Sequence, residues 1–152
     1  MLENIENIPA FKEAGIILLY YSLPDEVQTG DFIKKWSSRK TILLPVIKGD
    51  ILELKEYRDD SNVTMDNIYS IKEPIGEAFN KYEKIDLSII PGVSFDNKGH
   101  RLGRGKGYYD KLLPLINSKK IGICFEFQVS TNIPVDDFDF KMDEVWTEKG
   151  KL

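Results

Sequence analysis

The apolar run at residues 16–21, Ile-Ile-Leu-Leu-Tyr-Tyr, constrains the fold most, because six consecutive apolar residues cannot leave one face of a strand in water. Such a run is typical of a strand buried on both faces, as in a parallel sheet. Comparable segments at 41–46, 87–90 and 119–125 predict further strands, and a last strand is expected at 144–146. These spacings favour a sheet built from segments far apart in the chain.

Helix and turn signals separate the predicted strands. Thr29 stands where it can cap a helix that runs through Trp36. The turn at 48–50 joins the second strand to an alternating partner at 52–55, which predicts a hairpin. Strands that alternate with helices across short loops predict a single α/β domain over residues 1–152, with a mainly parallel sheet and flanking helices.

The remaining segments are less regular. Residues 2–14 have helical spacing that Pro9 interrupts, and residues 56–84 are polar and irregular. A glycine-rich loop at 103–107 is followed by a short helix that Pro114 ends or kinks. There is no internal repeat and no low-complexity tract.

Composition excludes several functional classes. A hydrophobic fraction of 41% and a net charge of −4 are ordinary for a globular chain and argue against broad nucleic-acid binding. Cys124 is the only cysteine, so an internal disulfide is impossible, and its apolar neighbours favour a buried side chain over a nucleophile. With His100 as the only histidine, a multi-histidine metal site is excluded. The chain has neither the roughly 18 consecutive apolar residues of a membrane span nor a basic secretory n-region, so we expect a cytoplasmic protein without a membrane partner.

The loops that follow the strands are the candidate ligand sites, because ligands of α/β sheets collect at the carboxyl ends of strands. These loops are 22–26 and 91–110. The second carries alternating glycines, three cations and a carboxylate: Gly103, Gly105, Gly107, Arg101, Arg104, Lys106 and Asp110. Alternating glycines let main-chain N–H groups surround an anion, the cations suit a polyphosphate, and the carboxylate suits Mg²⁺.

A G-x-G-x-G pattern alone is weak evidence, and a flexible basic surface loop is the alternative. The spacing is neither that of a P-loop nor that of a dinucleotide fingerprint. Tyr108 and Tyr109 shift the balance toward a binding site, since two aromatic residues beside clustered charge are poorly explained by solvation.

The whole block 91–110 is more specific. It reads P-G-x-x-F-D-x-x-G-x-R-L-G-x-G-x-G-Y-Y-D and resembles the signature of the 5-formyltetrahydrofolate cyclo-ligase family, also called methenyltetrahydrofolate synthetases. Shorter segments at 21–29, 43–46, 71–74 and 139–143 are also similar to family motifs. The resemblance extends from about residue 8 to residue 147.

The resemblance implies a fold shared with sugar-phosphate isomerases and CoA transferases, and an ATP- and Mg²⁺-dependent reaction. In that reaction the γ-phosphoryl group moves to the formyl oxygen of 5-formyltetrahydrofolate. A folate nitrogen then attacks the activated carbon, and loss of phosphate gives 5,10-methenyltetrahydrofolate. The protein contributes mainly positioning and charge stabilisation.

The resemblance also assigns roles to residues. The nucleotide phosphates would be held by Arg101, Leu102, Gly103, Arg104, Gly105, Lys106, Gly107, Tyr108 and Tyr109. The principal phosphate cations would be Arg101 and Lys106, and Mg²⁺ would be bound by Asp110 and Asp143. The catalytic group would comprise Arg104, Lys106 and Tyr108, of which Arg104 and Tyr108 would also contact the folate.

Three further residues would line the folate site. Glu26 would accept hydrogen bonds from the amino-pyrimidine edge of the pterin, and Tyr21 would form part of the pocket wall. Tyr69 would stack on the pterin, although a core or rim aromatic is an equal alternative at that position.

The chain departs from the family pattern at its amino end. Family members usually begin with a helix whose Lys and Arg face the ATP phosphates, whereas Lys12 is the only basic residue here before position 34. We therefore expect an amino-terminally truncated member with weak turnover, since one phosphate-directed cation contributes about 2–4 kcal/mol to transition-state stabilisation.

Two other functions remain open from the sequence. One is an isomerase or CoA-transferase relative with a carboxylate base and no nucleotide, and the other is a non-catalytic folate or anion binder. We expect the chain to be a monomer.

Overall fold

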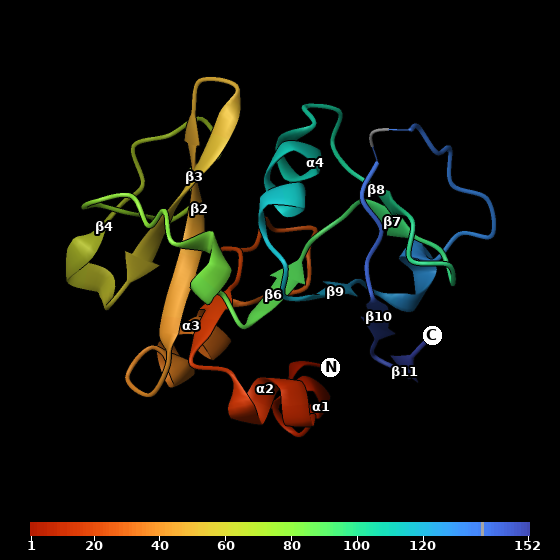
Figure 1. The fold of residues 1–152 in the computed structure, drawn as a ribbon, viewed down its shortest axis with the longest axis horizontal. Coiled ribbons are helices and arrows are strands. Elements are labelled where there is room, and N and C mark those ends of the chain that lie inside the picture. The colour runs from red at the N-terminus through yellow and green to blue at the C-terminus, as the bar shows by residue number, and fades with distance from the viewer. Residues whose placement is uncertain (138) are drawn as a thin grey trace.

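The computed structural model describes residues 1–137 and 139–152 and contains a seven-stranded sheet in the order β11-β10-β9-β6-β1-β2-β3 (Figure 1). The strands are β1 Ile16–Leu18, β2 Thr41–Lys48, β3 Ile51–Tyr57, β6 Leu87–Ile90, β9 Lys119–Ile123, β10 Glu144–Thr147 and β11 Gly150–Lys151. The pairs from β10 to β2 are parallel, and the two edge strands are antiparallel. The predicted mainly parallel α/β sheet is therefore confirmed.

Two small two-stranded sheets accompany the main sheet. One pairs β4 Val63–Thr64 with β5 Glu73–Pro74, and the other pairs β7 Ser94–Phe95 with β8 Arg101–Leu102. The helices are α1 Leu2–Glu6, α2 Pro9–Glu13, α3 Gly30–Trp36 and α4 Tyr108–Leu112. Short 3₁₀ turns lie at Asp60–Asn62, Tyr82–Lys84, Leu113–Leu115 and Glu126–Gln128.

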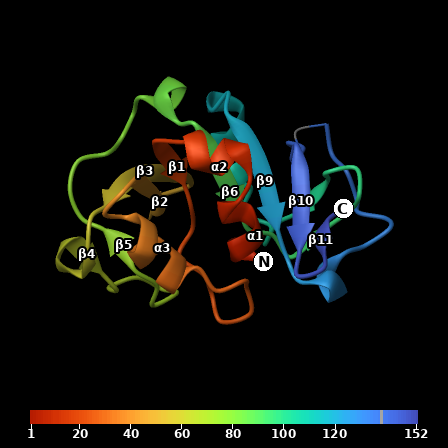
Figure 2. The same cartoon turned by 90° about the horizontal axis from the view of Figure 1, so that it is seen from below.

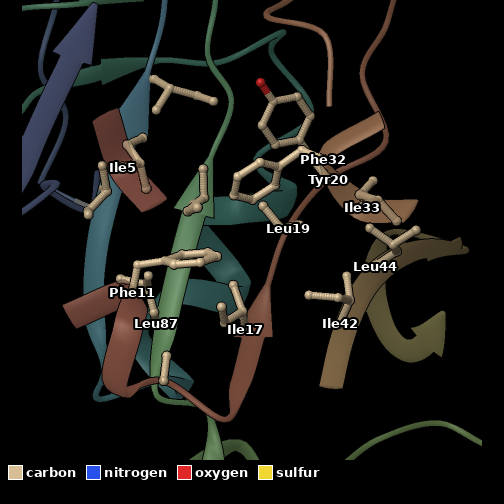
Figure 3. Packing of buried hydrophobic residues seen from close by; sticks show 14 of the residues in the cluster. Ile5, Phe11, Ile17, Leu19, Tyr20, Phe32, Ile33, Ile42, Leu44 and Leu87 are labelled. Carbon is tan, nitrogen blue, oxygen red and sulfur yellow. The ribbon is translucent and has the colours of Figure 1, made fainter. Parts of the chain in front are cut away.

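The sheet has a hydrophobic core on each face because its central strands are apolar throughout. Ile17 and Leu19 pack with α1, α2 and α3 on one face, whereas Leu18 belongs to the cluster that contains Leu112 of α4 on the other. Figure 1 shows α4 on one side of β6 and β9 and α1 and α2 on the other, and Figure 2 shows these two helices across the near face. In Figure 3, the ring of Phe11 lies over the sheet between Ile17 and Leu87.

Several local predictions hold, and two change in detail. The β2–β3 hairpin forms, with Gly49 at φ +63° in its turn, and Pro114 converts the end of α4 into a 3₁₀ turn. Thr29 precedes α3, but its side chain does not cap that helix. Its hydroxyl instead donates to the carbonyl of Tyr20 (2.6 Å) and accepts from the amide of Ser22 (3.1 Å).

Strand β1 is shorter than the apolar run that predicted it. Its last pairing with β2 is the hydrogen bond from the Leu19 amide to the Leu43 carbonyl (2.9 Å), so Tyr20 and Tyr21 lie beyond the ladder. Across residues 1–137 and 139–152, no helix has both the length and the apolar character needed to cross a bilayer.

Candidate nucleotide and folate site

A pocket of about 360 Å³ lies at the carboxyl ends of β1 and β6. Tyr20 and Tyr21 follow β1, Pro91 and Gly92 follow β6, and all four line the pocket. In the sheet, β1 and β6 are neighbours, and the chain continues from β1 to β2 on one side and from β6 to β9 on the other. Such switch points create a crevice between adjacent loops, as expected for the ligand site of an open α/β sheet.

The glycine-rich loop forms one wall of this pocket. Every residue from Arg101 to Asp110 lines it. Gly105 (φ +96°) and Gly107 (φ +68°) adopt left-handed conformations that favour glycine, and Gly107 immediately precedes α4. The backbone therefore turns sharply between β8 and α4, and its amides can surround an anion.

Arg101 is fixed beneath this loop. Its Nε donates to the Pro91 carbonyl (2.5 Å), and its guanidinium lies 4.7 Å from the centroid of the Tyr109 ring. A Cβ atom at Gly103 would stand 2.9 Å from Nη1 of Arg101, so glycine lets the loop backbone approach this cation. Burial lowers the pKa of Arg101 from its usual value, and burial raises the pKa of Tyr109. The site thus holds an oriented positive charge.

Arg104 connects the glycine-rich loop to the loop after β1. Its Nη2 donates to Asp25 (2.9 Å) and to Oε1 of Glu26 (3.3 Å). Burial acts to lower the pKa of Arg104, but the two carboxylates outweigh burial and raise it. Glu26 is only 9% exposed, and its Oε2 accepts from the amide of Leu23 (2.8 Å). A buried carboxylate and a cation therefore face the same pocket.

Aromatic and aliphatic side chains form the other walls. Tyr21 and Tyr69 both line the pocket, with Pro45 and Ile47 of β2 beside them. Nζ of Lys72 lies 5.7 Å from the centroid of the Tyr21 ring. These walls suit a flat aromatic ligand.

The tip of the β2–β3 hairpin contacts α4. The Tyr108 hydroxyl lies 3.4 Å from the Gly49 carbonyl that accepts its hydrogen bond. Nζ of Lys111 donates to the Asp50 carbonyl (3.0 Å). The hairpin thus braces the helix that follows the glycine-rich loop.

The carboxylates predicted to bind a metal do not share one pocket. Asp110 lines the large pocket, and its Oδ1 lies 3.4 Å from the amide nitrogen of Phe140. Asp143 lines a separate polar hollow and accepts from the amide of Lys120 (2.7 Å). Asp139 does line the pocket of Asp110. Within residues 1–137 and 139–152, no three His, Cys, Asp or Glu side chains form a metal cluster. Two carboxylates nevertheless fit Mg²⁺, which takes most of its ligands from water and phosphate.

The pocket brings together all the predicted site residues except Asp143: Tyr21, Glu26, Tyr69, Arg101, Leu102, Gly103, Arg104, Gly105, Lys106, Gly107, Tyr108, Tyr109 and Asp110. Two further carboxylates line the pocket, Glu73 and Asp139, to which the sequence had assigned no role in the site. Both stand in segments that resemble the family, 71–74 and 139–143, so the motifs could have drawn attention to them.

Comparison with known proteins agrees with this geometry. Residues 1–148 match the family model described as the 5-formyltetrahydrofolate cyclo-ligase family. A probable 5-formyltetrahydrofolate cyclo-ligase of Schizosaccharomyces pombe is 30% identical and aligns with 95% of this chain and 80% of its own length. The 5-formyltetrahydrofolate cyclo-ligase of Haemophilus influenzae is 30% identical over 91% of this chain and 79% of its own.

Solved structures extend the likeness to the fold. The 5,10-methenyltetrahydrofolate synthetase of Aquifex aeolicus superposes with a TM-score of 0.86 at 33% identity, covering 99% of this chain and 77% of that one. A 5,10-methenyltetrahydrofolate synthetase from Mycoplasma pneumoniae, at 23% identity, shares the fold with a TM-score of 0.73 over 95% of this chain and 79% of its own. The match over residues 1–148 shows that this chain belongs to the 5-formyltetrahydrofolate cyclo-ligase family.

Proposed function

We propose that this chain closes the ring of 5-formyltetrahydrofolate to give 5,10-methenyltetrahydrofolate, in a reaction that requires Mg²⁺ and converts ATP to ADP and phosphate. One observation carries the proposal. A single pocket joins the cationic glycine-rich loop to the buried carboxylate of Glu26, so a polyphosphate and a pterin can lie side by side.

The phosphate side of the pocket is the glycine-rich loop. Arg101 and Lys106 hold the phosphates, and the amides of the intervening glycines supply hydrogen-bond donors. Asp110 and Asp139 bind Mg²⁺, which when bound neutralises phosphate charge. The common pocket supports Asp139 over Asp143 as the second metal carboxylate.

The folate side lies between β1 and β2. Glu26 accepts from the amino-pyrimidine edge, and Tyr21 and Tyr69 bound the flat ring system. Arg104 of the glycine-rich loop and Tyr108, the first residue of α4, both line the pocket and contact the group that is activated. Because phosphoryl transfer depends on charge and alignment, the chain's own work is to hold the formyl oxygen in line with the phosphate.

The test is a turnover assay of the purified chain with 5-formyltetrahydrofolate, ATP and Mg²⁺. Methenyl product is followed by its near-ultraviolet absorbance, and phosphate release is followed in parallel. We expect one phosphate per methenyl group and no product when ATP is omitted or Mg²⁺ is chelated. Calorimetry that detects no Mg²⁺-dependent ATP binding would favour an isomerase-type relative, and folate binding without ATP consumption would favour a non-catalytic binder.

A further inference from the structure

The pocket exists partly because β2 extends beyond the end of its neighbour β1. Pairing between the two strands ends at Leu43, yet β2 continues to Lys48. Alternate residues of a strand direct their backbone groups to the same edge, so positions 45 and 47 also face the β1 side. Pro45 has no N–H, which leaves the Ile47 amide as a donor on an edge that β1 does not reach. Both residues line the pocket.

Glu73 satisfies this amide from a distant part of the chain. It is 8% exposed, lines the pocket and belongs to β5. Its Oε2 accepts the hydrogen bond of the Ile47 amide at 3.0 Å. Because an unpaired amide in such a position is unfavourable, this contact ties the β5 segment to the open edge of β2.

Asn67 closes the loop that leads into β5. Its Oδ1 accepts from the amides of Tyr69 (3.1 Å) and Ile71 (3.2 Å). Its Nδ2 donates to the carbonyl of Ile71 (2.6 Å). These hydrogen bonds close a ring over residues 67–71. Ser70 lies inside this ring at φ +51°, a left-handed conformation that a non-glycine residue rarely adopts without support. Asparagine side chains stabilise such turns by mimicking the backbone.

The ring determines which side chains face the ligand. Tyr69 and Ile71 line the pocket, whereas Ile68, between the same hydrogen-bonded positions, is 87% exposed. Asn67 fixes the start of this wall and Glu73 fixes its end. In the part of the chain that the structure describes, neither side chain hydrogen-bonds to the glycine-rich loop.

We propose that Asn67 and Glu73 are positioning residues for folate binding, which act by holding Tyr69 and Ile71 in the pocket wall. The proposal rests on the function proposed above. Since the phosphate-binding loop is held by other contacts, loss of either side chain weakens folate binding much more than ATP binding. Turnover at saturating folate changes little.

The experiment compares paired variants by calorimetry and steady-state kinetics. Glu73→Ala removes the acceptor for the Ile47 amide, whereas Glu73→Gln keeps it. Asn67→Ala opens the ring, and Ile68→Ala is a matched control on the same loop. We expect the Kd and KM for 5-formyltetrahydrofolate to rise about tenfold in the two informative alanine variants, with kcat and the Kd for ATP·Mg²⁺ within about twofold. Glu73→Gln and Ile68→Ala stay within about twofold of the parent chain on every measure.

Three results would overturn the inference. Unchanged folate affinity in both alanine variants would mean that the wall does not need these contacts. Equal losses of folate and ATP·Mg²⁺ affinity would mean general damage to the fold. A Glu73→Gln variant as weak as Glu73→Ala would mean that the carboxylate charge, and not the anchor, matters. The unsubstituted chain separates the two proposals, because its own failure to bind folate or turn over contradicts the function itself.

Discussion

The buried carboxylate of Glu26 gives the sharpest test of the folate site. Replacing it by Gln preserves shape and retains an oxygen that can accept from the Leu23 amide, which lies 2.8 Å away. The change removes the negative charge and replaces one of the two acceptor oxygens by an NH₂ group, which can only donate. A hydrogen bond to a charged group is worth about 1.5–3 kcal/mol. At one factor of ten per 1.4 kcal/mol, Glu26→Gln should raise the Kd for folate by about 10- to 140-fold.

Asp25→Asn is the matched control for this measurement. Asp25 also pairs with Arg104, but its side chain is 69% exposed, and solvent screens such a pair strongly. Its loss should change the folate Kd by less than about fivefold. Calorimetric titration of both variants with 5-formyltetrahydrofolate measures the difference. If Glu26→Gln bound folate as the parent chain does, or if both variants lost the same affinity, Glu26 would not be the pterin anchor.

Three further predictions concern the metal site, the core and the thiol. Asp139→Asn should raise the Mg²⁺ concentration for half-maximal turnover about tenfold, whereas Asp143→Asn should leave it within about twofold. The reverse order in a Mg²⁺ titration would favour Asp143 as the ligand. Gly122→Ala should cost about 1–3 kcal/mol of unfolding free energy, read from the urea midpoint, because its Cβ would stand 2.4 Å from Cε1 of buried Phe95. Burial raises the pKa of the Cys124 thiol to about 12, so at pH values well below 12 it stays protonated in the folded chain. A disulfide reagent should therefore label it only after denaturation, and rapid labelling of the native protein would contradict its burial.

Much of the sheet was predictable because its strands are continuously apolar. The segments at 41–46, 87–90 and 119–125 became β2, β6 and β9 within a few residues at each end. The run at 16–21 was a less exact guide, since β1 ends at Leu18. An apolar run shows which residues are buried, but not which of them pair with a neighbouring strand. Tyr20 is buried like the residues of β1, although it lies beyond the end of the strand.

Other features depend on contacts between distant residues and left no local pattern. Thr29 has a good capping side chain, but the carbonyl of Tyr20 and the amide of Ser22 compete for it successfully. The two-residue strands β7 and β8 are too short for any periodicity to register. Glycine spacing and charge predicted a ligand loop at residues 101–110, and these residues do line the pocket. The conformational freedom of glycine and the charge of a side chain are local properties, so the sequence alone can reveal them.

The choice between Asp139 and Asp143 as a proposed metal ligand shows the same limit at the site. Asp139 and Asp143 belong to one short motif, and composition does not distinguish them. Only the folded chain separates them. Each carboxylate accepts from a main-chain amide, but Asp139 lines the pocket of Asp110 whereas Asp143 lines a separate hollow. The chemistry of a residue can be predicted from its type, whereas its position in the folded structure depends on where the chain turns.

The hairpin tip and α4 should differ in how well they tolerate substitutions at the contact between them. Both hydrogen-bond acceptors, at Gly49 and Asp50, are main-chain carbonyls, which exist whatever side chain position 50 carries. The Asp50 carboxylate also lies 3.5 Å from Nζ of Lys111, but it is 89% exposed, so solvent screens this ion pair and it contributes little. The donors are the side chains of Tyr108 and Lys111, which have no such redundancy. Substitutions at position 50 should therefore have little effect as long as the turn closes, whereas Gly49 stays restricted by its positive φ. A library that varies positions 50, 108 and 111 should recover its diversity almost entirely at position 50.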